Sequence, residues 1–248
     1  MMEKLRVLDL FSGIGGFSLG LERTGGFETV AFCEIEEFPR RILAKHWPKV
    51  PCYHDVSNAE FSEAVDVVTA GFPCQDISIA NQNATGLAGE RSGLFWHILR
   101  AVCVVGRPRL VLENVAELLK RGMGRVLGAL AQIGYDTQWH CIPASAVGSL
   151  QERDRVWIIA DPAEVGATRL LTSADIGAAR QRRAGGASDL FTIVNAPFER
   201  GACHAEPLLR GMVSRVPGRV DRVGACGNSV DPAIPELIGR AILEARAA

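Results

Sequence analysis

Short apolar runs alternate with segments of helical spacing along the first 160 residues of the chain. The runs that predict buried strands cover Leu5–Leu10, Thr29–Cys33, Val65–Ala70, Leu110–Leu112 and Val156–Ala160. The segments with helix-like spacing cover Gly16–Thr24, Glu37–Lys45, Gly93–Val105 and Val115–Ile133. This alternation predicts an α/β fold with a doubly wound, mostly parallel sheet, in which ligands bind at the carboxyl ends of the strands.

The pattern breaks after Asp161. Residues 163–215 have no sustained periodicity and contain the basic run Arg180–Arg183, for which a solvated loop is a simpler interpretation than a phosphate contact. Helical spacing returns at Asp231–Ala247 and predicts a closing helix. We therefore expect one catalytic domain made of residues 1–160 and 217–248, with a small irregular insertion over residues 161–216.

Composition narrows the class of protein. Hydrophobic residues make up 48% and charged residues 22% of the 248 residues, which is typical of a globular protein. The seven cysteines include no C-x-x-C pair and the five histidines no metal spacing, so we expect neither a disulfide framework nor a metal site. Neither a signal peptide nor an apolar span is evident, so we expect a cytoplasmic protein with no membrane contact, and a monomer as the default.

A glycine turn follows the first predicted strand. The sequence Asp9-Leu-Phe-Ser-Gly-Ile-Gly-Gly-Phe17 lacks the third glycine of the dinucleotide fingerprint, because Ser18 occupies that position. Glu34 ends the next strand, about 20 residues after the turn, where an acid can bind ribose hydroxyls. A tight structural turn explains the glycines equally well, but the turn and the acid together favour a nucleoside site. Asp55 can contact an adenine amino group or cap a turn.

A cysteine follows the strand Val65–Ala70 in the sequence GFPCQDIS, residues 71–78. Cys74 comes directly after a proline, on a turn that can present its thiol, whereas a structural cysteine usually lies within an apolar element. Glu113 ends another strand at the start of Glu-Asn-Val, and the run Gln-Glu-Arg-Asp-Arg155 precedes the strand Val156–Ala160. Such a charged run is usually a solvated surface, but the adjacent apolar strand should hold its arginines at a strand end.

Five motifs of the chain resemble, in the same order, those of C5-cytosine-specific DNA methyltransferases: DLFSGIGGF, GFPCQDIS, ENV, QERDR and GNSV. The resemblance covers residues 5–160 and about 217–243, and the tail resembles the compact phage or prophage members. It implies a Rossmann-like methyltransferase that transfers a methyl group from S-adenosylmethionine to cytosine C5 in double-stranded DNA. The base must be flipped out of the duplex at a cost of roughly a few kcal/mol.

The resemblance also implies roles for individual residues. Cys74 would attack cytosine C6, Glu113 would hold or protonate N3, and Arg155 would contact O2 with Arg153 in support, although the motif does not separate the two arginines. S-adenosylmethionine contacts carry over to Phe11, Gly13, Gly15, Glu34, Asp55, Pro73, Leu94 and Asn228. Substrate contacts carry over to Phe72, Gln75, Ser78, Asn114 and Gln151.

The resemblance implies that the insertion over residues 161–216 is the target-recognition region, which reads the DNA. It is shorter than in typical bacterial members of the family, and the Arg-Glu block that precedes GNSV has no clear match. The motifs do not specify the target sequence or whether a restriction enzyme accompanies the protein. Two alternatives stay open beside the cytosine C5 DNA methyltransferase. One is a catalytically silent DNA-binding homologue, and the other is an RNA cytosine C5 methyltransferase.

Overall fold

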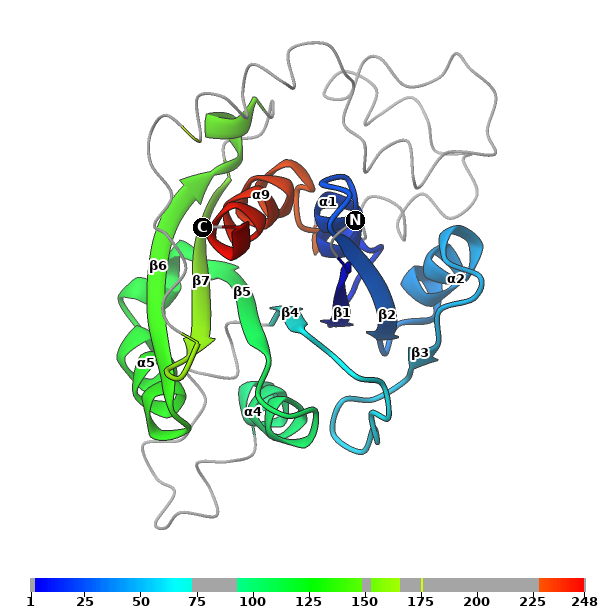
Figure 1. The fold of residues 1–248 in the computed structure, drawn as a ribbon, viewed down its shortest axis with the longest axis horizontal. Helices are drawn as coiled ribbons and strands as arrows, with labels where there is room; N and C mark the ends of the chain where they lie inside the picture. Colours follow the sequence, from blue (N-terminus) through cyan, green and yellow to red (C-terminus); the bar gives the residue numbers. More distant parts are fainter. Residues whose placement is uncertain (1–2, 73–92, 149–152, 166–174, 176–227, 248) are drawn as a thin grey trace, which may run out of the picture.

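A computed structural model describes residues 3–72, 93–148, 153–165, 175 and 228–247. Seven strands of this part of the chain form one sheet with the order β3-β2-β1-β4-β5-β7-β6 (Figure 1). The strands are β1 (Leu5–Leu10), β2 (Phe27–Cys33), β3 (Cys52–Tyr53), β4 (Val67–Gly71), β5 (Arg109–Val115), β6 (Tyr135–Pro143) and β7 (Asp154–Pro162).

The directions of the strands confirm the predicted fold class. Each neighbouring pair from β3 to β5 is parallel, whereas β7 is antiparallel to both β5 and β6. The sheet is therefore mixed but mostly parallel. Because β7 runs against its neighbours, its first residues lie at the same edge as the last residues of β5.

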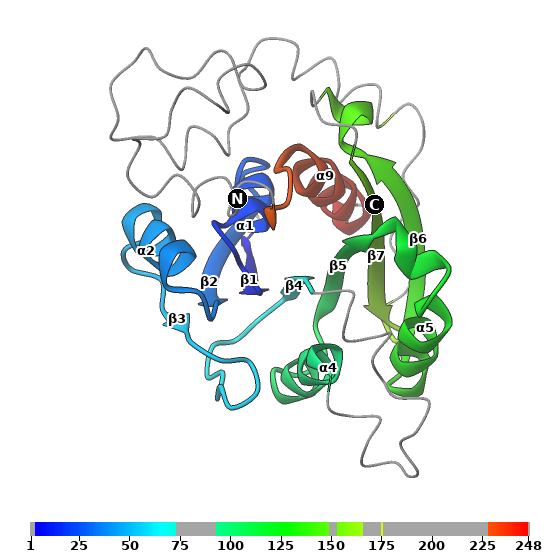
Figure 2. The same cartoon turned by 180° about the vertical axis from the view of Figure 1, so that it is seen from behind.

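Helices cover both faces of the sheet (Figures 1 and 2). Helices α1 and α9 lie side by side on one face, where they bury one apolar cluster, and α4 and α5 cover the other face and a second cluster. The helices are α1 (Gly16–Glu22), α2 (Glu37–His46), α4 (Leu94–Val104), α5 (Met123–Gln132) and α9 (Ala233–Ala247).

Two predictions from the apolar pattern need correction. The helix expected over Val115–Ile133 is wrong in its first half: Val115 ends β5, a 3₁₀ turn covers Ala116–Leu119, and α5 begins only at Met123. Gly122 has φ 143°, a backbone conformation that separates the two elements. Strand β6 was not predicted, because its sequence YDTQWHCIP has no continuous apolar run. It lies at the edge of the sheet, where one strand partner suffices.

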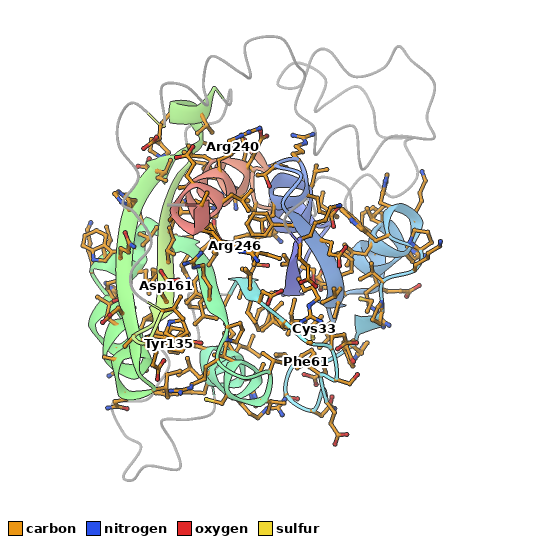
Figure 3. All side chains as sticks on the ribbon, viewed as in Figure 1. Cys33, Phe61, Tyr135, Asp161, Arg240 and Arg246 are labelled. Atoms are coloured by element: carbon orange, nitrogen blue, oxygen red, sulfur yellow. The ribbon has the colours of Figure 1, made fainter. Side chains whose placement is uncertain are left out.

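An ion pair links two strands at the end of the sheet opposite to the carboxyl edge. Arg109 at the start of β5 pairs through Nε with the Oδ1 of Asp161, near the end of β7. The Asp161 carboxylate is only 1% exposed, and nearby the hydroxyl of Tyr135 donates to the carbonyl of Pro108 at 2.6 Å. Figure 3 shows Asp161 and Tyr135 in this region, on β7 and β6. These contacts tie β5, β6 and β7 together far from the glycine turn.

A buried carboxyl lies beneath the glycine turn. The two oxygens of Asp9 accept hydrogen bonds from the hydroxyls of Thr69, at 2.7 Å, and Ser18, at 2.9 Å. This contact gives a structural reason for a serine where the dinucleotide fingerprint has its third glycine. Burial raises the pKa of Asp9 from 3.8 to about 7, although both hydroxyls act to lower it. Asp9 thereby joins β1, β4 and α1.

The described residues limit other kinds of site. Among them, no group of three or more potential ligands could hold a metal ion. The described cysteines, Cys33, Cys52, Cys103 and Cys141, are free thiols. Within the same residues, no helix has both the length and the apolar character that a membrane span needs.

Candidate active site

The carboxyl edge of the sheet brings together the predicted motifs that the structure describes. The glycine turn follows β1, Glu34 follows β2, Phe72 follows β4, and Glu113 lies near the end of β5. Arg155 of the QERDR run lies at the start of β7 and Arg153 directly precedes this strand, and both reach this edge because β7 is antiparallel. Strand direction therefore places all these groups at one end of one sheet.

An ion pair between Glu113 and Arg155 forms the centre of this edge. The Nε of Arg155 lies 2.7 Å from the Oε1 of Glu113, and the two side chains are 20% and 10% exposed. A second nitrogen of Arg155, Nη1, donates to the carbonyl of Asp154 at 2.8 Å. These two bonds use two of the five N–H donors of the guanidinium, so others can bind a ligand oxygen. The pair agrees with the roles predicted for Glu113 and Arg155 at one base, and those roles stay predictions.

The other oxygen of Glu113 lies near Gly71, where two apolar side chains also approach. A Cβ added to Gly71 would lie 3.4 Å from Oε2, and it would also lie 3.7 Å from atoms of Phe17 and Val230. Burial accordingly raises the pKa of Glu113, whereas the charges of Arg155 and Arg153 act to lower it. A carboxyl in this environment holds a proton more readily than a solvated one. Glu113 is therefore suited to donate a hydrogen bond as an acid.

Asn114 holds the chain that leads to Cys74. Its Nδ2 donates to the carbonyl of Phe72 at 2.8 Å, and its Oδ1 accepts from the amide of Val115 at 2.9 Å. Asn114 is 2% exposed and Phe72 is 3% exposed. This geometry favours a supporting role for both residues, which fix the chain two residues before Cys74. Their predicted contacts with substrate stay predictions.

The glycine turn has an unusual backbone that hydrogen bonds hold in place. Phe11 has φ 53° and Gly13 has φ 52°, and a Cβ at Gly13 would have no atom within 4 Å. The hydroxyl of Ser12 donates to the carbonyl of Asp9 at 2.5 Å, and it accepts from the amide of Cys33 at 3.2 Å. A left-handed backbone at a residue such as Phe11 is maintained only by its surroundings, and such strain is common at binding sites.

Gly15 must be glycine for a different reason. It has φ 86°, and a Cβ there would lie 2.8 Å from the ring of Trp47. Trp47 follows α2, and its Nε1 donates to the Oε2 of Glu22 at 3.0 Å. The structure thus shows Gly15 packed against an aromatic ring from another element. Its predicted contact with the cofactor stays a prediction, and neither Trp47 nor this contact was evident in the sequence.

Glu34 joins the glycine turn to the next helix. Its Oε2 accepts from the amide of Gly13 at 2.7 Å, and its Oε1 accepts from the amide of Glu36 at 2.8 Å. Burial raises the pKa of Glu34, and these amide bonds act to lower it. Each carboxylate oxygen has a further lone pair that can accept a hydroxyl proton. The residue therefore fits the ribose-binding role predicted for it.

Ile35 is a candidate that the motif reasoning missed. It directly follows Glu34, and its side chain is 58% exposed beside that buried carboxylate. An apolar surface next to an acid that is predicted to bind ribose suits the flat face of a purine. The signal in the sequence was an isoleucine between Glu34 and Glu36, in a segment otherwise acidic.

The remaining predicted cofactor contacts are spread along the same edge. Asp55 follows β3, and its Oδ1 accepts from the amide of Ser57 at 2.8 Å, so the turn-capping alternative is present in the structure. This bond is also the main reason that the pKa of Asp55 is lowered. Leu94 begins α4, and Asn228 is exposed just before Ser229. None of these contacts with a cofactor is tested by the geometry.

The two arginines of the QERDR run have different partners. Whereas Arg155 pairs with Glu113, the Nη1 of Arg153 donates to the carbonyl of Ser229 at 2.7 Å. Burial lowers the pKa of Arg153, and the neighbouring charge of Arg155 lowers it further. The structure therefore distinguishes two arginines, by their partners, whose roles the motif did not distinguish.

Several predicted residues lie outside the described part of the chain. They are Cys74, the proposed nucleophile, together with Pro73, Gln75, Ser78 and Gln151. The predicted insertion over residues 161–216 also lies outside it, except for residues 161–165 and 175. Their roles stay predictions.

Comparison with known proteins identifies the family. The profile of the C-5 cytosine-specific DNA methylase family matches residues 5–183. The chain belongs to this family. Its matched region contains the glycine turn, the Glu113–Arg155 pair and the segment that carries Cys74.

Members of the methylase family with curated functions are similar to this chain over their shared part. The type II methyltransferase M2.BsuMI of Bacillus subtilis is 34% identical over 173 residues, which are 65% of this chain and 44% of that protein. M.Sau3AI of Staphylococcus aureus is 34% identical over 182 residues, which are 63% of this chain and 43% of that protein. The match therefore spans less than half the length of these relatives.

Solved structures support the methylase fold. Dnmt2 of S. pombe superposes with a TM-score of 0.56 at 19% identity, over 75% of this chain and 57% of that one. A putative DNA modification methyltransferase from an E. coli prophage gives a TM-score of 0.54 at 23% identity, over 68% of this chain and 49% of that one. At these identities the similarity concerns the fold, an α/β architecture of S-adenosylmethionine-dependent methyltransferases.

Proposed function

We propose that this methylase transfers a methyl group from S-adenosylmethionine to carbon 5 of cytosine in double-stranded DNA. The observation that carries the proposal is the Glu113–Arg155 pair, because it presents an acid and a cation side by side at the carboxyl edge. One planar base can contact both groups. Gly71 pairs with Glu113 across β4 and β5, so the segment that leads to Cys74 starts beside this pair.

The glycine turn and Glu34 are suited to the methyl donor. Open space at Gly13, the spare acceptors of Glu34 and the exposed side chain of Ile35 suit a nucleoside with a ribose and a purine. When bound, S-adenosylmethionine supplies a methyl group on a positively charged sulfur. We assign the ribose to Glu34 and the purine to the apolar surface of Ile35, with Phe11, Asp55, Leu94 and Asn228 as further contacts.

Carbon 5 of cytosine is a poor nucleophile, so the enzyme must activate the ring. In the proposed mechanism, the Cys74 thiolate forms a bond to C6, and the electron pair of the C5–C6 double bond makes C5 nucleophilic. Glu113 donates a proton or hydrogen bond to N3, which prevents negative charge from building up on the ring. Methyl transfer to C5 would leave S-adenosylhomocysteine as the second product. A base from the solvent then takes the C5 proton, N3 returns its proton to Glu113, and the sulfur–C6 bond breaks. The thiolate is thereby regenerated.

Arg155 is assigned to the O2 oxygen of the same cytosine. Its remaining N–H donors can bind a carbonyl oxygen while Nε holds Glu113. The two contacts would orient the ring, and the ion pair keeps the acid and the cation at a fixed separation. A cytosine inside a duplex cannot reach this edge, so we propose that the base is flipped out. We also propose that residues 161–216 read the DNA sequence.

The test uses the full chain, S-adenosylmethionine with a labelled methyl group, and duplex DNA that contains many sequence contexts. We expect label in the 5-methylcytosine of DNA, and none with the Cys74→Ser variant. A duplex with 5-fluorocytosine in the methylated site should give a covalent adduct, because fluorine blocks the loss of the C5 proton. Labelling by Cys74→Ser at the normal rate would exclude the covalent mechanism.

Parallel reactions with structured RNA and with DNA binding alone distinguish the alternatives. Label in RNA but not in DNA would indicate an RNA methyltransferase. DNA binding without transfer on any sequence would indicate a silent homologue. Either result would overturn the proposed activity.

A further inference from the structure

The segment that precedes α9 contacts both halves of the candidate site. Ser229 and Val230 are 5% and 8% exposed, and they lie between Asn228, a proposed donor contact, and helix α9. On one side the carbonyl of Ser229 accepts a hydrogen bond from Arg153 at 2.7 Å. On the other side this segment lies directly against α1. We name residues 228–232 the bridging segment.

Two glycines of α1 allow this contact. A Cβ at Gly16 would collide with the carbonyl oxygen of Val230, and a Cβ at Gly20 would collide with the carbonyl oxygen of Pro232. The two glycines are four residues apart, so they lie on one face of the helix. The backbone of the bridging segment therefore lies against the helix that follows the glycine turn. A shift of this segment must affect α1.

The bridging segment also touches the base-binding half of the site. The side chain of Val230 lies within 3.7 Å of the position where a Cβ of Gly71 would be, and Oε2 of Glu113 lies 3.4 Å from the same position. Arg155 in β7 projects from the same face of the sheet as Glu113, and Arg153 directly precedes β7, two residues before Arg155. One short segment thus contacts the glycine-turn helix and Arg153, and its Val230 lies close to Gly71, the strand partner of Glu113.

We infer that Arg153 is a positioning residue, which holds the bridging segment in place and so couples the methyl-donor site to the cytosine site. The inference rests on the proposed function, and it replaces the expectation that Arg153 assists Arg155 at the base. Arg153 is half-buried. It donates a hydrogen bond to the carbonyl of Ser229 and interacts with the charge of Glu113. Its Nε is a buried donor with no partner in the described residues, which fits a side chain held by one strong contact.

Arg153 should affect the Kd for S-adenosylmethionine even in the absence of DNA. Loss of a hydrogen bond from a charged donor should free the bridging segment, displace Asn228 and raise the Kd for S-adenosylmethionine about tenfold in Arg153→Met. Arg155→Met is the matched control, because it removes the same group only two residues further along the chain. It should bind the cofactor within about twofold of the wild-type affinity. Arg155→Met should instead lose methyl transfer.

A conservative variant adds a second criterion. A lysine at position 153 can still donate one hydrogen bond to the carbonyl of Ser229, whereas it cannot imitate a planar guanidinium that reads a base. Arg153→Lys should therefore recover most of the cofactor affinity, within about threefold of wild type. If Arg153→Met does not fold, Arg153→Gln provides a milder loss, and its Kd should rise in the same direction.

The experiment combines calorimetric titration of S-adenosylmethionine with hydrogen exchange of the protein without ligands. The amides of residues 229–234 should exchange faster in Arg153→Met than in Arg155→Met, which is a readout that does not depend on the cofactor. Wild-type cofactor affinity and unchanged exchange in Arg153→Met would overturn the inference but leave the proposed function intact. Failure of the wild-type chain to bind the cofactor would instead overturn both.

Discussion

Strands β5 and β7 carry an arginine–carboxylate pair at each end, and the two pairs differ in their surroundings. Arg155–Glu113 lies at the carboxyl edge and Arg109–Asp161 at the opposite edge. Both lie on the face that α1 and α9 cover, and in both the carboxylate is the more buried partner. The chemistry of the side chains is therefore the same. Their neighbours decide whether a pair holds the sheet together or can act on a substrate.

The neighbours at the carboxyl edge are those expected of the proposed active site. Glu113 lies beside Gly71, Phe17 and Val230, near the segment that leads to Cys74 and next to a second arginine. Asp161 lies beside Tyr135, whose hydroxyl is bound to a backbone carbonyl. An ion pair alone therefore does not indicate an active site. The convergence of several strand ends on one pair does.

The largest expected effect is on catalysis by Glu113→Gln. Glutamine keeps the shape of the side chain but cannot act as an acid, so methyl transfer should fall about 10²–10⁴-fold. Single-turnover transfer of labelled methyl groups measures this loss. Asp161→Asn is the matched control at the other end of the strands, and its folded fraction should transfer methyl groups at close to the wild-type rate. Equal losses in both variants would contradict the difference proposed between the two pairs.

For the free energy of unfolding we expect the opposite order, with a larger loss in Asp161→Asn than in Glu113→Gln. Asp161→Asn leaves the half-buried Arg109 without its partner, and the free energy of unfolding in urea should fall by about 3–5 kcal/mol. The double variant Arg109→Met with Asp161→Leu should recover most of it. The raised pKa of Glu113 implies that its stabilising contribution is complete below the ordinary pKa of 4.5 and is lost as the pH rises through the folded-state value. Glu113→Gln also leaves Arg155 without its partner, but it removes the unfavourable burial of a charged Glu113, so at pH 8 it should lower the free energy of unfolding by less than Asp161→Asn does.

The sequence predicts this arrangement only in part. The apolar runs locate the central strands, and each run ends at a polar motif, so parallel strands place the glycine turn, Glu34 and Glu113 at one edge. The direction of β7 is not evident from its apolar residues, although it brings Arg155 to Glu113. Local patterns specify strands, but they do not specify strand direction.

Contacts over long separations were not predictable for a related reason. Trp47 fills the space at Gly15, and Arg153 binds the carbonyl of Ser229, which is 76 residues further along the chain. In each case the partner is a ring or a backbone atom, which leaves no recognisable residue pattern. Strand β6 was missed because an edge strand needs little apolar character.

A third buried carboxyl, Asp9, differs from Glu113 and Asp161 because it accepts hydrogen bonds from two hydroxyl groups instead of pairing with an arginine. A rise in its pKa from 3.8 to about 7 corresponds to about 4 kcal/mol at most. This stability is fully present below the ordinary pKa and is lost as the pH rises through about 7. Asn at this position can accept from Thr69 and donate to Ser18. Asp9→Asn should therefore be more stable than wild type above pH 7.

Urea unfolding of both proteins from pH 4 to pH 8 measures the effect of Asp9. The other acids with raised pKa values, Glu34 and Glu113, are present in both proteins, so the difference between the curves reports Asp9. The difference should grow as the pH rises. Parallel curves would show that Asp9 has the same proton affinity in the folded and unfolded chains.

The smallest expected effect tests the surroundings of Glu113 without removing any charge. In Gly71→Ala the new methyl group would lie 3.4 Å from Oε2, an ordinary contact, so the fold should tolerate it. The free energy of unfolding should rise by about 0.4–1 kcal/mol, because alanine restricts the unfolded chain.

The new methyl group of Gly71→Ala further shields Glu113 from water and should raise its pKa, which moves the alkaline limit of methyl transfer to higher pH. The pH profile of single-turnover transfer checks this, and a shift of the acid limit to higher pH, with no change at the alkaline limit, would mean that Glu113 acts as a base. Gly128→Ala, at an exposed position of α5 where a Cβ meets no atom within 4 Å, is the control that should leave the profile unchanged.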